Sequence, residues 1–173
     1  MLSGETASGR YPVRAVNFMN TMALYNENKM LCGSEDGNLC KGVSSGFVPT
    51  STDQTHAVVR SAVSLLNKES GVSISKVIVF SESGYTARVI SSFRPSVPVI
   101  AFSESETAVD TLTLSYGITS FKGDFAQVTD NYKNLFTNLI EKGLLYKGEQ
   151  VVVIHGNRWQ EHSKTNAMVI LTA

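Results

Sequence analysis

Residues 76–88 read Lys76-Val77-Ile78-Val79-Phe80-Ser81-Glu82-Ser83-Gly84-Tyr85-Thr86-Ala87-Arg88, and this stretch decides the fold. It begins with an uninterrupted apolar run rich in β-branched residues, which is typical of a strand covered on both faces. A polar turn containing one glycine follows, and then an amphipathic segment of helical character. The same order of apolar run, polar turn, amphipathic segment and glycine or proline stop repeats toward the carboxyl end.

Further apolar runs predict strands at residues 97–102, 118–121, 151–154 and 168–171. Helices are predicted between them over residues 86–93, 106–116 and 125–142, which stop at Arg94-Pro95, Gly117 and Gly143. Alternating strands and helices favour a doubly wound parallel sheet. The last run follows its predecessor without a helical pattern between them, so we expect it to pair antiparallel. The predicted fold is a three-layer αβα domain with a mostly parallel five-stranded sheet and an antiparallel carboxyl-terminal edge strand.

The amino-terminal part predicts two helices and a connection. Pro12 suits a first helical turn, and a helix is expected over residues 12–28. The following stretch is rich in turn-forming residues and lacks periodicity. Thr52 or Asp53 can cap a second helix that reaches Leu66, and Gly71 suits a left-handed stop. The predicted division is 1–30, a connection at 31–50, and a domain over 51–173.

Composition narrows the classes of partner. Of 173 residues, 15 are Lys or Arg and 15 are Asp or Glu, so no basic surface for nucleic acid or anionic lipid is expected. No apolar run approaches the roughly 20 residues of a membrane span, and the first residues lack the basic and apolar pattern of a leader peptide. We therefore expect a cytoplasmic protein without nucleic-acid or membrane partners.

The cysteines and histidines predict no metal site. Cys32 and Cys40 are eight residues apart, without the close spacing of zinc or thiol-redox motifs. His155 and His162 are seven apart on a predicted loop, and His56 is remote in sequence. We expect reduced thiols and solvated loop histidines.

Four collinear segments resemble the pyruvate kinase family. They are residues 1–16 (Met1-Leu2-Ser3-Gly4-Glu5-Thr6-Ala7 through Tyr11-Pro12-Val13-Arg14-Ala15-Val16), residues 76–88, residues 93–102 (Phe93-Arg94-Pro95 through Phe102) and residues 164–168 (Lys164-Thr165-Asn166-Ala167-Met168). The resemblance implies the C-terminal domain of that family, preceded over 1–30 by the tip of the last strand of the catalytic barrel and its following helix. Ser3, Glu5 and Thr6 are then expected to form a frayed end.

The resemblance also implies the function. Pyruvate kinases transfer phosphate from phosphoenolpyruvate to ADP in glycolysis, and this part regulates the enzyme and forms subunit contacts. In the family, magnesium and potassium are bound by the barrel. We therefore expect no cofactor and no catalytic residue in this chain, and no activity of the chain alone. The expected partners are its own subunits, through Met168 to Leu171, and a phosphorylated metabolite.

The candidate effector or phosphate site is the turn between the first domain strand and its helix, formed by Ser81, Glu82, Ser83, Gly84, Tyr85 and Thr86. Backbone N–H groups and the hydroxyls of Ser81, Ser83 and Thr86 can converge on an anion at the positive end of a helix. Alternatively, Ser83 and Thr86 only cap the turn. The segment is similar to the family's loop for an effector phosphate, but some activated members carry lysine at position 82. A carboxylate there would cost about 1–3 kcal/mol.

The last loop supplies three further candidates. Arg158 and Lys164 can pair with an anion. Trp159 can stack on a ligand or a partner subunit, or pack on its own loop. The loop lacks the glycines with which the family's effector loop closes over sugar.

A second class of function is a stand-alone small-molecule or phosphate-binding α/β domain, since doubly wound sheets serve many activities. An independent enzyme would need a convergent nucleophile and base. No cysteine pairs with a suitable histidine, and Gly-x-Ser-x-Gly is missing. The sequence favours the regulatory and subunit-contact domain.

Overall fold

The computed structural model describes residues 2–32, 53–66, 71–123, 132–156 and 165–173. The chain divides into two compact units, Met1–Gly46 and Phe47–Ala173. The division falls within the range predicted as a connection. Among the helices described, none combines the length and apolarity that a bilayer crossing requires.

The first unit contains the helices α1 (Gly4–Ala7) and α2 (Pro12–Cys32). The predicted helix from Pro12 is confirmed and extends four residues beyond Asn28, because the next glycine comes only at position 33. The first residues do not form the expected frayed end. Instead Ala7 N–H and the Thr6 hydroxyl both donate to the carbonyl of Ser3, at 3.0 and 2.9 Å, and close a single helical turn.

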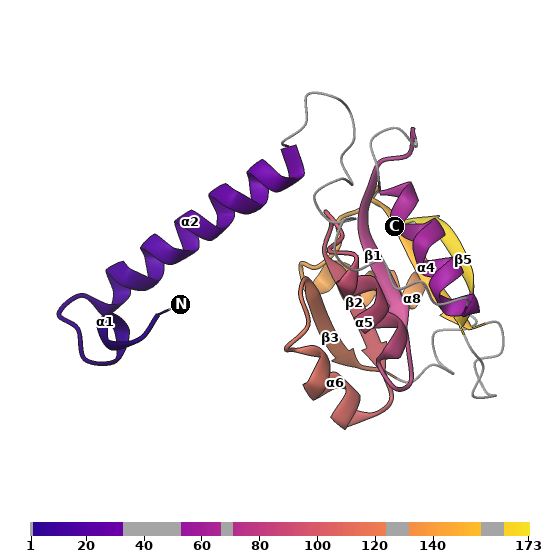
Figure 1. The fold of residues 1–173 in the computed structure, drawn as a ribbon. Helices are drawn as coiled ribbons and strands as arrows, with labels where there is room; N and C mark the ends of the chain where they lie inside the picture. Colours follow the sequence, from indigo (N-terminus) through magenta and orange to yellow (C-terminus); the bar gives the residue numbers. More distant parts are fainter. Residues whose placement is uncertain (1, 33–52, 67–70, 124–131, 157–164) are drawn as a thin grey trace. The chain divides into compact units, whose positions relative to one another are not determined.

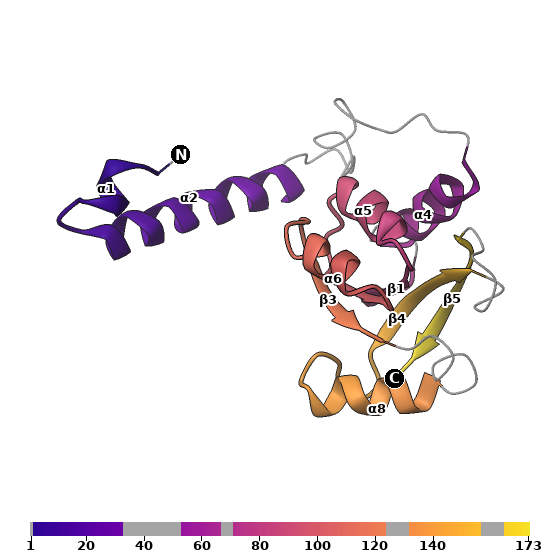
Figure 2. The same cartoon turned by 90° about the horizontal axis from the view of Figure 1, so that it is seen from below.

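The second unit contains one five-stranded sheet with helices on both faces (Figures 1 and 2). In chain order its elements are α4 (Gln54–Leu65), β1 (Ile74–Phe80), α5 (Tyr85–Ser92), β2 (Val99–Ser103), α6 (Glu106–Leu112), β3 (Ile118–Lys122), α8 (Tyr132–Glu141), β4 (Gln150–Gly156) and β5 (Thr165–Thr172). The strand order is β3-β2-β1-β4-β5, with every pair parallel except β4 with β5. The three-layer fold and its antiparallel edge strand are therefore confirmed.

The order of strands places a topological switch point in the middle of the sheet. From β1 the chain builds outward through β2 to β3, and then returns to add β4 on the other side of β1. Val77 consequently pairs with Val99 on one side and with Val152 on the other. In open α/β sheets, ligands bind at the carboxyl ends of the strands where the order reverses. In this domain that place is the end of β1.

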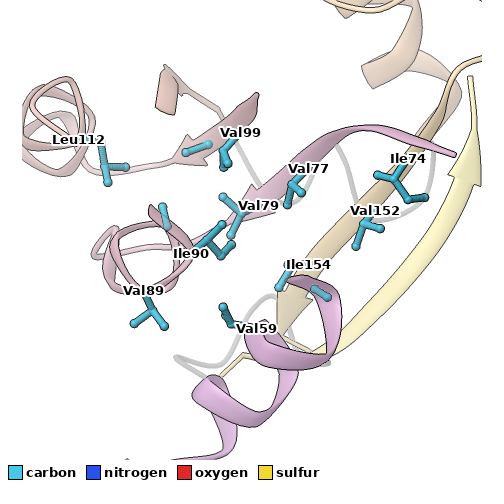
Figure 3. Packing of buried hydrophobic residues seen from close by; sticks show 13 residues of the cluster. Val59, Ile74, Val77, Val79, Val89, Ile90, Val99, Leu112, Val152 and Ile154 are labelled. Carbon is cyan, nitrogen blue, oxygen red and sulfur yellow. The ribbon is translucent and has the colours of Figure 1, made fainter. Parts of the chain in front are cut away.

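Successive side chains of β1 point to opposite faces of the sheet, and each face is covered by helices. Both sets of side chains are therefore buried in a core, which is why the sequence of the strand is apolar without interruption. Val77 and Val79 face α4, α5 and α6, where they pack with Ile90 and Leu112 (Figure 3). Ile78 and Phe80 face the opposite side, which is covered by α8. A fully buried aliphatic side chain stabilises the fold by roughly 1.5–3 kcal/mol.

Several predicted boundaries were wrong by a few residues. Helix α6 ends at Leu112, short of Tyr116, because Thr113 and Ser115 tighten the chain into turns: Thr113 Oγ1 donates to Asp110 O at 2.6 Å, and Ser115 N–H donates to Leu112 O at 2.9 Å. Strand β5 begins at Thr165, three residues before the predicted start.

Asp53 occupies the backbone position of the cap of α4, but its side chain makes no cap hydrogen bond there. The alternative cap, Thr52, lies outside the described residues, as does the predicted start of the helix over 125–142.

Candidate functional site

The predicted turn follows the last residue of β1 and leads directly into α5, at the switch point of the sheet. Gly84 is the N-cap residue of α5 and has φ +72°, a left-handed conformation that a glycine adopts without strain. A Cβ at this position would lie 3.2 Å from the Leu112 side chain and 3.3 Å from Arg88 Nη1. The glycine thus allows the turn to lie tightly against α6 and α5.

The Ser81 side chain accepts a hydrogen bond from one of the free N–H groups in the first turn of α5. Its Oγ accepts a hydrogen bond from Thr86 N–H at 3.3 Å, and its own N–H donates to Phe102 O at 3.0 Å. In the alternative that the turn is only capped, the sequence named Ser83 and Thr86; the capping bond observed joins the Ser81 hydroxyl to the N–H of Thr86, whose own hydroxyl contacts Thr165. Ser81 and Thr86 are buried, whereas Glu82, Ser83 and Tyr85 are exposed. An anion arriving from solvent would meet the exposed side chains first.

Ser103, at the end of β2, fixes the turn from the side. Its buried hydroxyl donates to Glu82 O at 2.6 Å and accepts from Ser105 N–H at 3.1 Å. Ser105 in turn caps α6 by accepting from Ala108 N–H at 3.4 Å. The turns after two neighbouring strands are thereby joined through one hydroxyl.

Arg88 was missed by the sequence reasoning. Its Nη1 donates to Ser83 O at 3.2 Å, which places a guanidinium beside the turn and opposes the charge of Glu82. The available signal was its spacing: Arg88 lies four residues after Gly84, on the same face of α5.

His56 lies beside the turn, although 29 residues separate it from Tyr85 in the sequence. It is buried in the first turn of α4, and its Nε2 is 3.1 Å from the hydroxyl of Tyr85. The two rings meet edge to face, with centroids 6.2 Å apart. No local pattern indicates this contact, because it joins residues on two different helices.

His155 was predicted to be a solvated loop residue, and this is wrong. The apolar run of β4 continues through it, so that His155 is buried and its Nδ1 donates to Gly156 O at 2.9 Å. His162 lies outside the described residues, as do Arg158, Trp159 and Lys164. Within the described ranges, no three His, Cys, Asp or Glu side chains come together as a metal site.

Among the strands that the structure describes, β5 forms one edge of the sheet and pairs with β4 alone. Three successive apolar side chains of this strand are partly exposed to solvent: Met168 at 38%, Val169 at 38% and Ile170 at 42%. Thr165, its first residue, is buried, and its Oγ1 lies 2.6 Å from Thr86 Oγ1.

Comparison with known proteins identifies the family. The family model described as "Pyruvate kinase, alpha/beta domain" matches residues 56–171. Pyruvate kinase from Eimeria tenella is 31% identical over 99% of this chain and 31% of its own length, and that from Candida albicans is 32% identical over 98% and 34%. The crystal structure of Cryptosporidium parvum pyruvate kinase superposes with a TM-score of 0.70 and 26% identity, over 99% of this chain and 32% of that chain.

The chain thus spans about a third of the length of these relatives. The likeness extends beyond the matched domain to nearly every residue of the chain, and the residues outside 56–171 include the helix α2. The chain therefore belongs to the pyruvate kinase family and contains its alpha/beta domain.

Proposed function

We propose that this chain serves as the cytoplasmic, regulatory and subunit-contact part of a glycolytic pyruvate kinase, and that it has no phosphotransfer activity by itself. The observation that carries the proposal is the position of the turn Ser81–Thr86. It joins the central strand to the start of α5 at the point where the order of strands reverses. That position, together with the partial positive charge of a helix start, suits a phosphate group.

The charges beside the turn favour weak binding. Glu82 carries an exposed carboxylate within the turn, and Arg88 brings a guanidinium to Ser83 O on the other side. In addition, Thr86 N–H is already bonded to Ser81 Oγ, so an anion must compete for that donor. We propose weak affinity for inorganic phosphate or a phosphomonoester, and poor affinity for fructose 1,6-bisphosphate.

Replacing Glu82 with lysine tests this proposal. The change replaces the repulsion between the carboxylate and a phosphate by an attraction between the lysine ammonium and the phosphate. We estimate the difference in binding free energy at roughly 1–3 kcal/mol at an exposed site, which lowers Kd by about one to two decades. Calorimetric titration with the bisphosphate should show this gain. The matched control is Glu141→Lys, which makes the same change in net charge on α8, on the opposite face of the sheet.

Two results contradict the proposal. Tight binding by the wild-type chain would mean that the charge of the turn has been misjudged. Equal gains from Glu82→Lys and Glu141→Lys would mean that net charge, and not the turn, determines binding.

Subunit contact is proposed for β5. A strand that pairs on one side only and exposes apolar side chains is seldom left uncovered. Pairing of two β5 strands around a two-fold axis would continue the sheet across a dimer.

The catalytic chemistry of phosphoryl transfer is assigned to the barrel of the parent enzyme, since this chemistry depends on positioned metal ions and charges.

A further inference from the structure

A buried histidine joins the first turns of two helices. His56 lies in the first turn of α4 and is 5% exposed, and its Nε2 is 3.1 Å from the hydroxyl of Tyr85 in the first turn of α5. The rest of α4 packs against α5, β4 and β5. The hydrogen bond between these two side chains therefore holds the beginnings of α4 and α5 to each other.

The second nitrogen of the His56 ring lacks such a bond. Nδ1 is buried, and among the residues that the structure describes it has no hydrogen-bond partner. A neutral imidazole carries one N–H and one acceptor nitrogen. We assign the N–H to Nε2, which then donates to the Tyr85 hydroxyl, because the other tautomer would bury an N–H without an acceptor.

A proton on Nδ1 removes this solution. The imidazolium has two N–H donors, and the second would be buried without an acceptor. It would also bring a positive charge to the positive end of α4. Burial of a charged donor without a partner destabilises the state that contains it. The contact between His56 and Tyr85 therefore suits the neutral ring only.

The other charged or titratable groups on the elements around this ring do not reverse the argument. Besides the tyrosine hydroxyl, they are Asp53 at the start of α4, Glu82 in the turn before α5, Arg60 on α4, Arg88 on α5 and His155 on β4. The described residues of β5 include no charged side chain. Two carboxylates are thus balanced by two guanidinium groups, and no net negative charge is left to stabilise an imidazolium.

We propose that the contact between His56 and Tyr85 is an acid-sensitive switch, which opens at mildly acidic pH and releases the first turn of α4 from that of α5. The direction follows from proton linkage. In the open state the ring reaches water and takes up a proton as a free imidazole does, whereas the closed state excludes that proton, so a fall in pH favours opening. The inference rests on this contact and does not depend on anion binding at the neighbouring turn.

Amide hydrogen exchange of the full chain at pH 7.5 and 5.5 tests the proposal. The informative amides are those of residues 57–60 and 88–90, because they donate to carbonyls at the beginnings of the two helices, as Ala57 N–H does to Asp53 O and Arg88 N–H to Gly84 O. Protection factors are compared, since these are corrected for the intrinsic effect of pH on exchange. The amides of β1 report on global unfolding.

We expect protection of both helices to fall about three- to tenfold between pH 7.5 and 5.5, while protection of β1 stays the same. The upper limit is set by the free imidazole, whose pKa of about 6.5 lies one unit above the lower pH. The ring signals of His56, followed by NMR over the same range, should change together with the protection of both helices.

Two variants make the test specific. His56→Gln keeps an amide N–H that can donate to Tyr85 but takes up no proton, so its protection should not change between the two pH values. The matched control is His155→Gln, which removes the other histidine of the described chain and should keep the acid effect at its wild-type size. If His56→Gln fails to fold in urea-unfolding measurements at pH 7.5, the NMR titration of the wild type and the control variant decide the question.

Constant protection of the wild type between pH 7.5 and 5.5 would overturn the proposal. An acid effect that survives in His56→Gln, or that disappears in His155→Gln, would overturn it as well, because another group would then be responsible. An equal loss of protection in β1 would show general unfolding and no switch between the two helices.

Discussion

Replacing Gly84 with alanine should destabilise the domain more than the same replacement at Gly117. Both glycines have left-handed backbones, with φ +72° and +69°. In that conformation, a residue with a Cβ lowers the stability of the folded state by about 1–2 kcal/mol. Alanine also reduces the conformational entropy of the unfolded chain, which offsets about 0.4–1 kcal/mol of this loss. Nothing lies within 4 Å of a Cβ at Gly117, so Gly117→Ala should cost only about 1 kcal/mol.

At Gly84 a second cost arises. The new Cβ would lie 3.2 Å from the side chain of Leu112, which has no exposed surface and therefore little room to move. Overpacking of this kind costs about 1–3 kcal/mol, which brings the expected total for Gly84→Ala to about 2–4 kcal/mol. The domain should still fold, since typical stabilities are about 5–15 kcal/mol.

Urea unfolding followed by circular dichroism measures both variants. With a slope of about 1–3 kcal/mol per molar urea, the midpoint of Gly84→Ala should lie about 1 M below that of Gly117→Ala. Equal midpoints for the two variants would refute the reasoning, because the contact between the new Cβ and the side chain of Leu112 would then add nothing to the loss of stability.

Three other predictions follow from the structure and the proposed function. Lys76 Nζ lies 2.8 Å from Glu149 Oε2, and this hydrogen bond, with a second from Tyr146 N–H, holds the pKa of Glu149 below its ordinary value of 4.5. Glu149→Gln should therefore cost about 1 kcal/mol of stability above pH 5, and the difference from wild type should vanish as the pH falls through the lowered pKa. Urea unfolding from pH 3 to 7 checks this, and a difference that persists at the acid end would contradict it. The purified chain should show no transfer from phosphoenolpyruvate to ADP in a coupled assay, and turnover that survives removal of host pyruvate kinase would disprove this. Sedimentation over a concentration series should show self-association that weakens in Val169→Lys, whereas a strict monomer at high concentration argues against a contact through β5.

The sheet was predictable because each strand has a local signature. The runs over 77–80 and 151–154 are uninterrupted and β-branched, as strands buried on both faces require. The final strand was predicted as antiparallel from the missing helix before it, and the pairing of Val152 with Ile170 confirms this. Helix ends were less accurate, because Thr113 and Ser115 close turns that periodicity does not reveal.

For the candidate site, the sequence predicted the strand, the glycine turn and the helix around residues 81–86, and the structure confirms these elements. That the turn binds an anion stays a prediction, and the side chains that contact the turn come from distant segments. His56 meets Tyr85 from another helix, and Thr165 meets Thr86 from the last strand. Such contacts depend on how elements pack, and a single sequence contains no periodic signal for them.

The central position of β1 has a consequence for how the domain is made. During synthesis β1, β2 and β3 leave the ribosome before β4, so the backbone groups of β1 on the side of β4 have no strand to pair with until the residues from Gln150 onward have emerged. A half-built sheet of this kind exposes an apolar strand edge, which favours association with other nascent chains. Long-range parallel pairing is also slow to form. The time between the synthesis of β3 and that of β4 is therefore the period in which a chaperone would matter most.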